Sequence, residues 1–276
     1  MYIQRIAAFS MGEVGGNPAG VALCDQLPEA AVMQEAAREI GYSETAFAAP
    51  TDGGWRVRYF APDMEVPFCG HATIALGAAL ALKYGSREFV LFLNDTQISV
   101  HGEQRESTLS AELQSPATHS KTASLELIDA ALKLFSLTKG DLDPRIPPAI
   151  AAAGAQHLIL PLHNLDLIRS MQYEFEAGKK LMLKHSLTTI ALVYAQTPQR
   201  FHVRNAFASG GVYEDPATGA AAAALAGYLR DRDWPHGGHI DILQGDDMGF
   251  PSRIRADISP VPNGSIRVSG LARVIE

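Results

Sequence analysis

The sequence predicts an α+β protein of two similar lobes, each built from mostly local hairpins and one central helix. Two observations predict this fold. The strand patterns cluster into local hairpins instead of alternating with helices in a parallel βαβ rhythm. In addition, two alanine-rich helical segments, one in each half of the chain, resemble each other and each follows a strand by a similar interval.

The composition fits this fold and excludes several classes of function. The 276 residues are 47% hydrophobic and 19% charged, which is enough to bury a sizeable core in one or two domains. A net charge of −7 without a dense run of Lys or Arg argues against a nucleic-acid or anionic-membrane partner. The N-terminus has no signal-peptide pattern, and the longest small-apolar run, 72–82, is far shorter than the ~20 residues that span a bilayer. We expect a cytoplasmic protein.

The cysteine content points the same way. Cys24 and Cys69 are the two cysteines of the chain, so there is no disulfide framework and no Cys-based zinc site. A reducing compartment is the simplest context. Two adjacent aspartates, Asp246 and Asp247, have no partner spacing that supports a metal site. We expect no metal.

The first half of the chain shows strands, one glycine-rich loop and two helices, recognised from apolar spacing and turn residues. Strands are predicted at 3–9, 21–23, 45–49, 55–60, 89–93, 97–100 and 107–113, helices at 27–40 and 72–84, and the loop at 11–18.

The second half repeats this pattern after a polar, proline-containing segment, 115–124, which is the best candidate linker. Helices are predicted at 125–135, 175–183 and 217–230, and strands at 157–160, 188–194, 201–205, 239–243, 253–258 and 265–274. The expected N-terminal lobe is therefore 1–116, completed by the C-terminal strand at about 264–276, and the second lobe is 117–263.

An internal repeat supports two related lobes. A shift of 145 residues places 72–81 on 217–226 with seven of ten positions identical, although five of the seven are alanine on alanine. Thr73 on Thr218 and Leu80 on Leu225 carry more weight. We interpret the match as a duplication in which Gly70 falls on Asp215.

The two alanine-rich helices matter for function because small side chains let a sheet wrap closely around them. The N-terminus of each helix offers unpaired N–H groups and about half a unit of positive charge. If the two N-termini met at the lobe interface, they would form a site for an anion such as a carboxylate substrate or an enolate-like transition state. The simpler alternative is two core helices with capped ends.

Several polar residues are candidates for the chemistry. Glu44 stands at the mouth of an apolar strand, where it suits a general acid or base, although these residues alone favour a surface glutamate. Cys69 and His71 flank a helix start; we prefer a small buried cysteine, and we leave open whether the histidine is catalytic or a helix cap. Asp215 with Pro216 is explained by helix capping alone, and a catalytic role is possible but not required.

Backbone groups complete the candidate site. The glycine-rich segment around Asn17 is no dinucleotide fingerprint, because its spacing is wrong and no helix follows at once. It could cradle a carboxylate through backbone N–H groups and the Asn17 amide, or form a tight turn. The candidate substrate-binding residues are Asn17 and the residues at the two helix starts, namely Gly70, Ala72, Gly219 and Ala220.

Six motifs occur in order along the chain: Gly16-Asn17-Pro18-Ala19-Gly20-Val21, Gly41-Tyr42-Ser43-Glu44-Thr45-Ala46-Phe47, Arg58-Tyr59-Phe60-Ala61-Pro62, Cys69-Gly70-His71-Ala72-Thr73, Glu214-Asp215-Pro216-Ala217-Thr218-Gly219 and Gln244-Gly245-X-X-Met248-Gly249. Taken together, these motifs resemble the PhzF-like (phenazine biosynthesis-like) proteins of the diaminopimelate epimerase superfamily, over about residues 1–270.

This resemblance implies two pseudo-symmetric lobes, each a curved, mostly antiparallel, barrel-like sheet wrapped around a central helix, with an active site in the cleft between them. It also implies a homodimer and proton transfer at carbon without a cofactor. It assigns Glu44 as the catalytic acid/base, with His71 and Asp215 positioning or protonating the substrate. Gly70 and Asp215 stand where epimerase and racemase relatives keep a cysteine, which argues against two-thiol racemisation. Two positions depart from the family pattern: Ala220 replaces a common Ser, and Phe250 replaces a common Arg.

The leading hypothesis is therefore an isomerase of a small carboxylic acid, of the dihydro-hydroxyanthranilate isomerase type. One alternative is an epimerase or racemase of an amino or hydroxy acid with bases on both faces, for instance Glu44 and Asp215. Another is an acid-binding protein that has kept the fold and lost the reaction.

Overall fold

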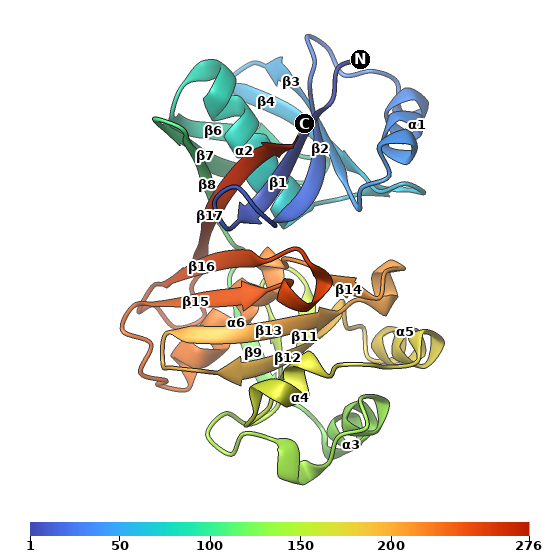
Figure 1. Cartoon of the computed structure of the whole chain (residues 1–276). Helices are drawn as coiled ribbons and strands as arrows, with labels where there is room; N and C mark the ends of the chain where they lie inside the picture. The colour runs from blue at the N-terminus through green and yellow to red at the C-terminus, as the bar shows by residue number, and fades with distance from the viewer. Residues whose placement is uncertain (276) are drawn as a thin grey trace. The chain divides into compact units, whose positions relative to one another are not determined.

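The structure, a computed structural model, describes residues 1–275 and divides into two compact units (Figure 1). Unit 1 consists of Met1–Gln114 together with the C-terminal segment from Ser269, and unit 2 is Ser115–Val268. Among the described residues, no helix is long and apolar enough to cross a membrane.

Unit 1 is a mixed sheet that surrounds one buried helix. Its elements are β1 (Gln4–Ser10), β2 (Asn17–Leu23), α1 (Ala30–Ile40), β3 (Thr45–Thr51), β4 (Gly54–Phe60), β5 (Glu65–Val66), α2 (Gly70–Tyr84), β6 (Arg87–Phe92), β7 (Gln97–Arg105), β8 (Thr108–Gln114) and most of β17 (Ile266–Ile275). The strand order is β17-β1-β2-β3-β4-β6-β7-β8, and β17 also pairs with β8, which closes the sheet around α2 (Figure 1).

Small residues let the sheet approach α2 closely. Eleven of the 15 residues of α2 are buried. A Cβ atom added to Gly102 in β7 would lie 2.1 Å from the Gly77 carbonyl oxygen, and one added to Gly77 would lie 2.6 Å from Val100. Both distances are shorter than real Cβ contacts. Glycine is therefore required on both sides of this helix–sheet contact.

Unit 2 has the same architecture with additional helices. Its elements are β9 (His119–Thr122), α3 (Leu125–Leu134), a 3-10 turn (Lys139–Asp141), β10 (Ala149–Ala152), β11 (Gln156–Pro161), α4 (Leu165–Arg169), α5 (Phe175–Lys184), β12 (Thr189–Ala195), β13 (Arg200–Ala206), a 3-10 turn (Ala208–Gly210), β14 (Glu214–Asp215), α6 (Gly219–Asp231), β15 (His239–Gln244), a 3-10 turn (Asp246–Met248) and β16 (Ser252–Ile258). Helix α6 is the central helix, with 11 of its 13 residues buried.

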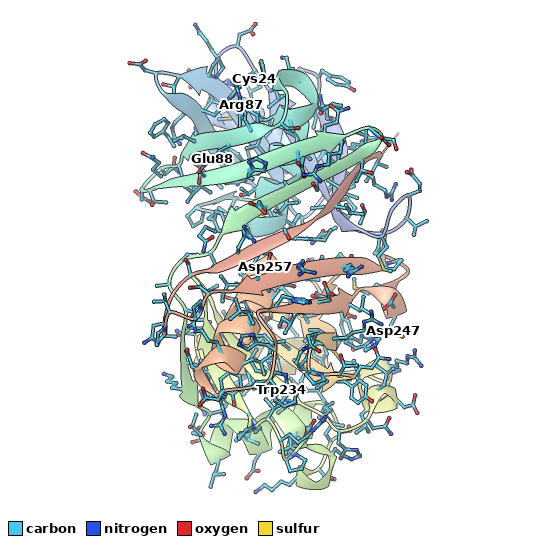
Figure 2. All side chains as sticks on the ribbon, turned by 90° about the vertical axis from the view of Figure 1, so that its left-hand side faces the viewer. Cys24, Arg87, Glu88, Trp234, Asp247 and Asp257 are labelled. Atoms are coloured by element: carbon cyan, nitrogen blue, oxygen red, sulfur yellow. The ribbon has the colours of Figure 1, made fainter. Side chains whose placement is uncertain are left out.

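Side chains on the outside of each unit follow the expected polarity. Arg87 and Glu88 at the start of β6 are exposed on unit 1 (Figure 2). On unit 2, Asp257 of β16 pairs with Arg255 and Arg267 (Figure 2). These are solvated ion pairs, and pairs of this kind contribute little to stability.

The two units repeat one topology, which confirms the predicted duplication. In both units five successive strand pairings alternate between antiparallel and parallel, and the first is antiparallel. The strand order is β1-β2-β3-β4-β6-β7 in unit 1 and β10-β11-β12-β13-β15-β16 in unit 2. A two-residue strand, β5 or β14, precedes the central helix in each unit.

The predicted register of 145 residues is wrong for the central helices. These helices start at Gly70 and Gly219, and β5 and β14 before them start at Glu65 and Glu214, so equivalent positions in this part of the two units are 149 residues apart. The error of four residues is about one helical turn, which keeps the same face of an alanine-rich helix in register. Gly70 is therefore equivalent to Gly219 and not to Asp215.

Two other expectations also need correction. The segment 115–124 is not a free linker, because it belongs to unit 2 and contains β9, which pairs with β10. Helix α6 begins at Gly219, and the residue at its N-cap is Thr218, so Asp215 does not cap the helix.

Candidate active site

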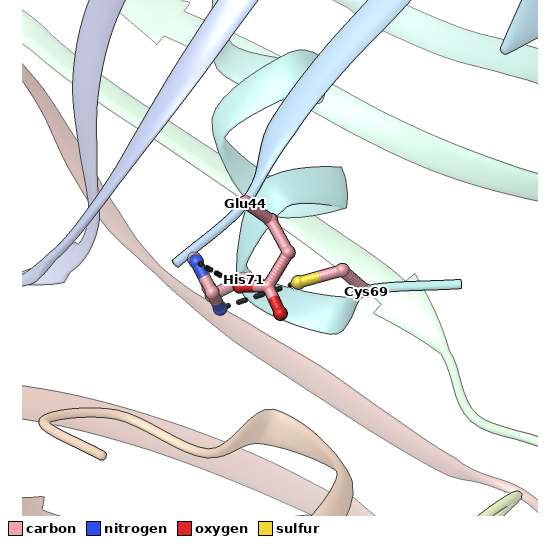
Figure 3. Close-up of side chains that lie close together, drawn as sticks. All are labelled: Glu44, Cys69 and His71. Atoms are coloured by element: carbon pink, nitrogen blue, oxygen red, sulfur yellow. Dashed lines mark hydrogen bonds and ion pairs between the residues drawn. The ribbon is translucent and has the colours of Figure 1, made fainter. Parts of the chain in front are cut away.

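Three polar side chains meet at the N-terminus of α2 (Figure 3). Glu44 directly precedes β3, while Cys69 is the N-cap of α2 and His71 lies in its first turn. A carboxylate oxygen of Glu44 lies 3.5 Å from Nε2 of His71, and Nδ1 of the same ring lies 3.3 Å from Sγ of Cys69. The imidazole therefore stands between the thiol and the carboxylate.

The cluster is largely shielded from water. The side chain of Glu44 is 16% exposed and that of His71 is 7% exposed, and Cys69 is buried. Glu44 is therefore not the surface residue that its local sequence favoured. His71 does not cap its helix either, because Cys69 holds the N-cap position.

Polar groups face both nitrogens of the His71 ring. A carboxylate oxygen of Glu44 and the hydroxyl of Ser43 lie 3.5 Å and 3.4 Å from Nε2, and the thiol of Cys69 lies 3.3 Å from Nδ1. The two ring nitrogens therefore have polar neighbours on opposite sides, and these contacts hold the ring against the Glu44 carboxylate.

The same three residues are potential metal ligands, since their ligand atoms all lie within 4.8 Å of one another. Thiolate, imidazole and carboxylate suit zinc. The two ring nitrogens of His71, however, face different partners, and one ion would require them to be redirected. We therefore treat this cluster as a hydrogen-bonded relay.

The start of α2 is held in place by a buried hydroxyl pair. Thr73 donates to the Cys69 carbonyl at 2.7 Å, and its hydroxyl lies 2.7 Å from that of Tyr59. Burial raises the pKa of Tyr59 well above its ordinary value, so this phenol stays neutral and acts through hydrogen bonds. The side chain of Cys69 makes no capping hydrogen bond to the helix, so the first-turn N–H groups are left to other partners.

Asp215 lies in unit 2, on β14, and hydrogen bonds and ring stacking hold the two residues that precede it. Glu214 accepts two hydrogen bonds from the guanidinium of Arg204, one of them 2.9 Å long between Nε and Oε1. Tyr213 stacks on Tyr173 with ring centroids 4.3 Å apart, and the two tyrosines also exchange hydrogen bonds with each other's backbone. Asp215 itself is buried.

The carboxylate of Asp215 contacts the N-cap of α6. Oδ2 accepts a hydrogen bond of 2.6 Å from the hydroxyl of Thr218. Gln244, at the end of β15, donates to the Asp215 carbonyl at 2.6 Å and to the Thr218 hydroxyl at 3.1 Å. A Cβ atom on Gly245 would lie 2.8 Å from the Pro216 carbonyl oxygen, and φ there is +80°, so glycine brings this loop against the Asp215 segment.

The candidate residues fall into two groups, one in each unit. In unit 1 the structure brings Glu44 and His71 together, with Gly70 and Ala72 in the same first turn of α2. Asn17 is buried at the first position of β2.

In unit 2, Gly219 and Ala220 open α6 beside Asp215, and Phe250 is half-exposed. The sequence did not point to Thr218 or Gln244 as site residues, although both lie inside the motifs that carry the resemblance.

A family model for phenazine biosynthesis-like proteins, PhzC-PhzF, matches residues 6–276. The chain belongs to this family. It is 33% identical over 284 residues to an uncharacterized isomerase of Mesorhizobium japonicum, covering 96% of this chain and 93% of that protein. It is 32% identical over 282 residues to the trans-2,3-dihydro-3-hydroxyanthranilate isomerase of Pseudomonas aeruginosa, covering 96% of this chain and 94% of that enzyme.

Solved structures agree on the fold. The crystal structure of a phenazine biosynthesis protein of the PhzF family from Bacillus anthracis has a TM-score of 0.86 and 22% sequence identity, covering 99% of this chain and 96% of the other. The expected fold is confirmed, and this PhzF-like chain is an isomerase.

Proposed function

We propose that this isomerase works without a cofactor and moves a proton between carbon atoms of a small carboxylic acid, with Glu44 as the general acid/base. The observation that carries the proposal is the shielded Glu44 carboxylate, held by His71 at the N-terminus of α2. A proton acceptor of this kind contributes about 10²–10⁴-fold to a proton transfer.

The reaction needs no oxidant or reductant. Glu44 takes a proton from a carbon next to an unsaturated system, and the electron pair of the broken C–H bond spreads over that system. The protonated Glu44 then returns a proton to a different carbon, so the substrate and product have the same composition. His71 keeps the carboxylate oriented through both steps. N–H groups at helix starts stabilise the substrate carboxylate and the developing negative charge.

The proposed substrate class is a small cyclic acid related to the one in the name of the Pseudomonas aeruginosa relative. The proposal gives Asp215 the second role implied by the resemblance, positioning or protonating the substrate. Ala220, at the second position of α6, offers no hydroxyl, so the substrate would be recognised without a hydrogen bond from that side chain.

The test compares Glu44→Gln with wild type, using trans-2,3-dihydro-3-hydroxyanthranilate and a panel of related acids. The amide keeps the size of the side chain but cannot take the proton. We expect kcat to fall by about 10²-fold or more, with unchanged folding and nearly unchanged ligand binding. Glu13→Gln, the same change of charge at an exposed residue, is the matched control and should keep full activity. Turnover by Glu44→Gln at the wild-type rate would refute the proposal.

A further inference from the structure

A chain of buried polar side chains crosses unit 2 and ends at Asp215. It runs from β11 through β12 and β13 to β15. Four of its members, on these four strands, are 0–2% exposed: His157, Thr189, Asn205 and Gln244. Burying this many polar groups is costly unless every contact is satisfied, so the chain calls for an explanation.

The first links of the chain have one polarity. The hydroxyl of Thr189 donates to Oδ1 of Asn205 at 2.9 Å, so its oxygen must accept from Nδ1 of His157, 2.8 Å away. Nδ2 of Asn205 then donates to Oε1 of Gln244 at 3.5 Å. Each group therefore donates towards β15.

The last links continue in the same sense. Nε2 of Gln244 donates to the hydroxyl of Thr218 at 3.1 Å, and that hydroxyl donates to Oδ2 of Asp215 at 2.6 Å. One continuous path of side-chain hydrogen bonds thus runs from His157 to the carboxylate of Asp215, each donor facing the next acceptor. Chains of aligned hydrogen bonds polarise one another, so an anion at the end is the arrangement that they favour.

The far end of the chain is a neutral histidine with a fixed tautomer. Burial lowers the pKa of His157 to about 4, so the ring carries one hydrogen near neutral pH. Its Nε2 atom is buried and has no hydrogen-bond partner among the described residues. The single hydrogen therefore resides on Nδ1, where Thr189 accepts it.

We propose that Gln244 is a positioning residue for Asp215, and that the buried chain behind it fixes the orientation of the Asp215 carboxylate. The proposal rests on the proposed function for the role of Asp215 in the reaction. Its basis is that the one side chain of Gln244 makes three hydrogen bonds around this carboxylate. Its Nε2 atom donates to the carbonyl of Asp215 and to the hydroxyl of Thr218, and its Oε1 atom accepts from the backbone N–H of Thr218 at 3.3 Å.

The same geometry restricts what Thr218 can do. Its hydroxyl hydrogen is used by Asp215 and its oxygen accepts from Gln244. Thr218 is therefore a link between Gln244 and Asp215 and not a donor to the substrate. A misplacement of about 1 Å at a reacting group can cost about 10²-fold in rate, so a break in the chain should lower kcat more than it raises KM.

The test breaks the chain at Thr189, four links from the carboxylate. Thr189→Val keeps the shape and removes the hydroxyl, whereas Thr189→Ser keeps the hydroxyl. We expect Thr189→Val to lower kcat about tenfold to a hundredfold with a small change in KM, and Thr189→Ser to restore most of the loss. Thr118→Val makes the same exchange at another buried threonine of unit 2 that lies outside the chain, and it should leave kcat unchanged.

A second measurement does not depend on turnover. ¹⁵N NMR of the histidine side chains should show His157 in wild type with a protonated Nδ1 and an unprotonated Nε2, and Thr189→Val should perturb this signal. The opposite tautomer overturns the chain, whatever the enzyme does. An unchanged kcat in folded Thr189→Val, with an active wild type, overturns the positioning role and leaves the proposed function intact. A wild type without isomerase activity refutes the proposed function, and the tautomer then decides whether the chain exists.

Discussion

Removing the charge of Glu214 is predicted to destabilise unit 2 strongly, because it leaves Arg204 as a buried cation without its hydrogen-bonded ion-pair partner. The two side chains are 11% and 3% exposed, for Arg204 and Glu214 respectively, so water screens their interaction little. Loss of one partner of a buried pair typically costs about 3–5 kcal/mol. We expect Glu214→Gln to lower the free energy of unfolding of unit 2 by this amount.

Unit 1 contains the matched control. Arg58 of β4 and Glu65 of β5 form an equivalent two-pronged pair, but their side chains are 22% and 26% exposed. Partial exposure restores screening, so Glu65→Gln should cost about 1 kcal/mol or less. The contrast between the two variants isolates the effect of burial, since the chemistry and the local topology are the same.

The assay is urea unfolding followed by tryptophan fluorescence. The chain has two tryptophans, Trp55 in β4 of unit 1 and Trp234 after α6 in unit 2 (Figure 2). Variants with a single tryptophan therefore report each unit separately, which matters because a chain of two units need not unfold in one step. Equal losses for Glu214→Gln and Glu65→Gln would refute the reasoning from burial.

The remaining predictions concern the central helices and pH. Gly77→Ala should destabilise unit 1 by about 1–3 kcal/mol, because the added Cβ would lie 2.6 Å from Val100. A Cβ added at Gly70 would have no neighbour within 4 Å, so Gly70→Ala should keep wild-type stability. If Gly70 lines the site, Gly70→Ala should weaken ligand binding. Urea titrations and ligand titrations would check both; a stable Gly77→Ala would contradict the close packing. The pKa of His157 is lowered from 6.5 to about 4 in the fold, so the unfolded chain binds the proton more readily and unit 2 should lose about 3 kcal/mol as pH falls from 6.5 to 4. His157→Gln should remove this loss, and an unchanged pH dependence would contradict it.

The architecture was predictable because it is encoded locally. Hairpin patterns, the alanine-rich character of α2 and α6, and the duplication could all be recognised in the sequence. The register of the repeat could not be recognised, because a shift of four residues still aligns alanine with alanine and hardly changes which face of the helix is compared. β9 was missed because a short, polar strand such as His119–Thr122 has no apolar alternation to recognise.

The site was only partly predictable for a different reason. Glu44, His71 and Asp215 could be named from motifs, but their surroundings depend on contacts between residues far apart in sequence. Gln244 and Asp215 are 29 residues apart in the sequence. Thr189 on β12 lies between His157 on β11 and Asn205 on β13 and is hydrogen-bonded to both. No local pattern records such pairings, so the partners of Asp215 emerge only from the fold.

The central claim is that Glu44 moves a proton at carbon, and solvent deuterium incorporation tests it most directly. Wild type, Glu44→Gln and Glu13→Gln would be incubated in D2O with trans-2,3-dihydro-3-hydroxyanthranilate and related small acids, and the mass of the products would be measured. We predict deuterium at a carbon atom with wild type and Glu13→Gln, and none with Glu44→Gln. Incorporation by Glu44→Gln at the wild-type rate would contradict the account.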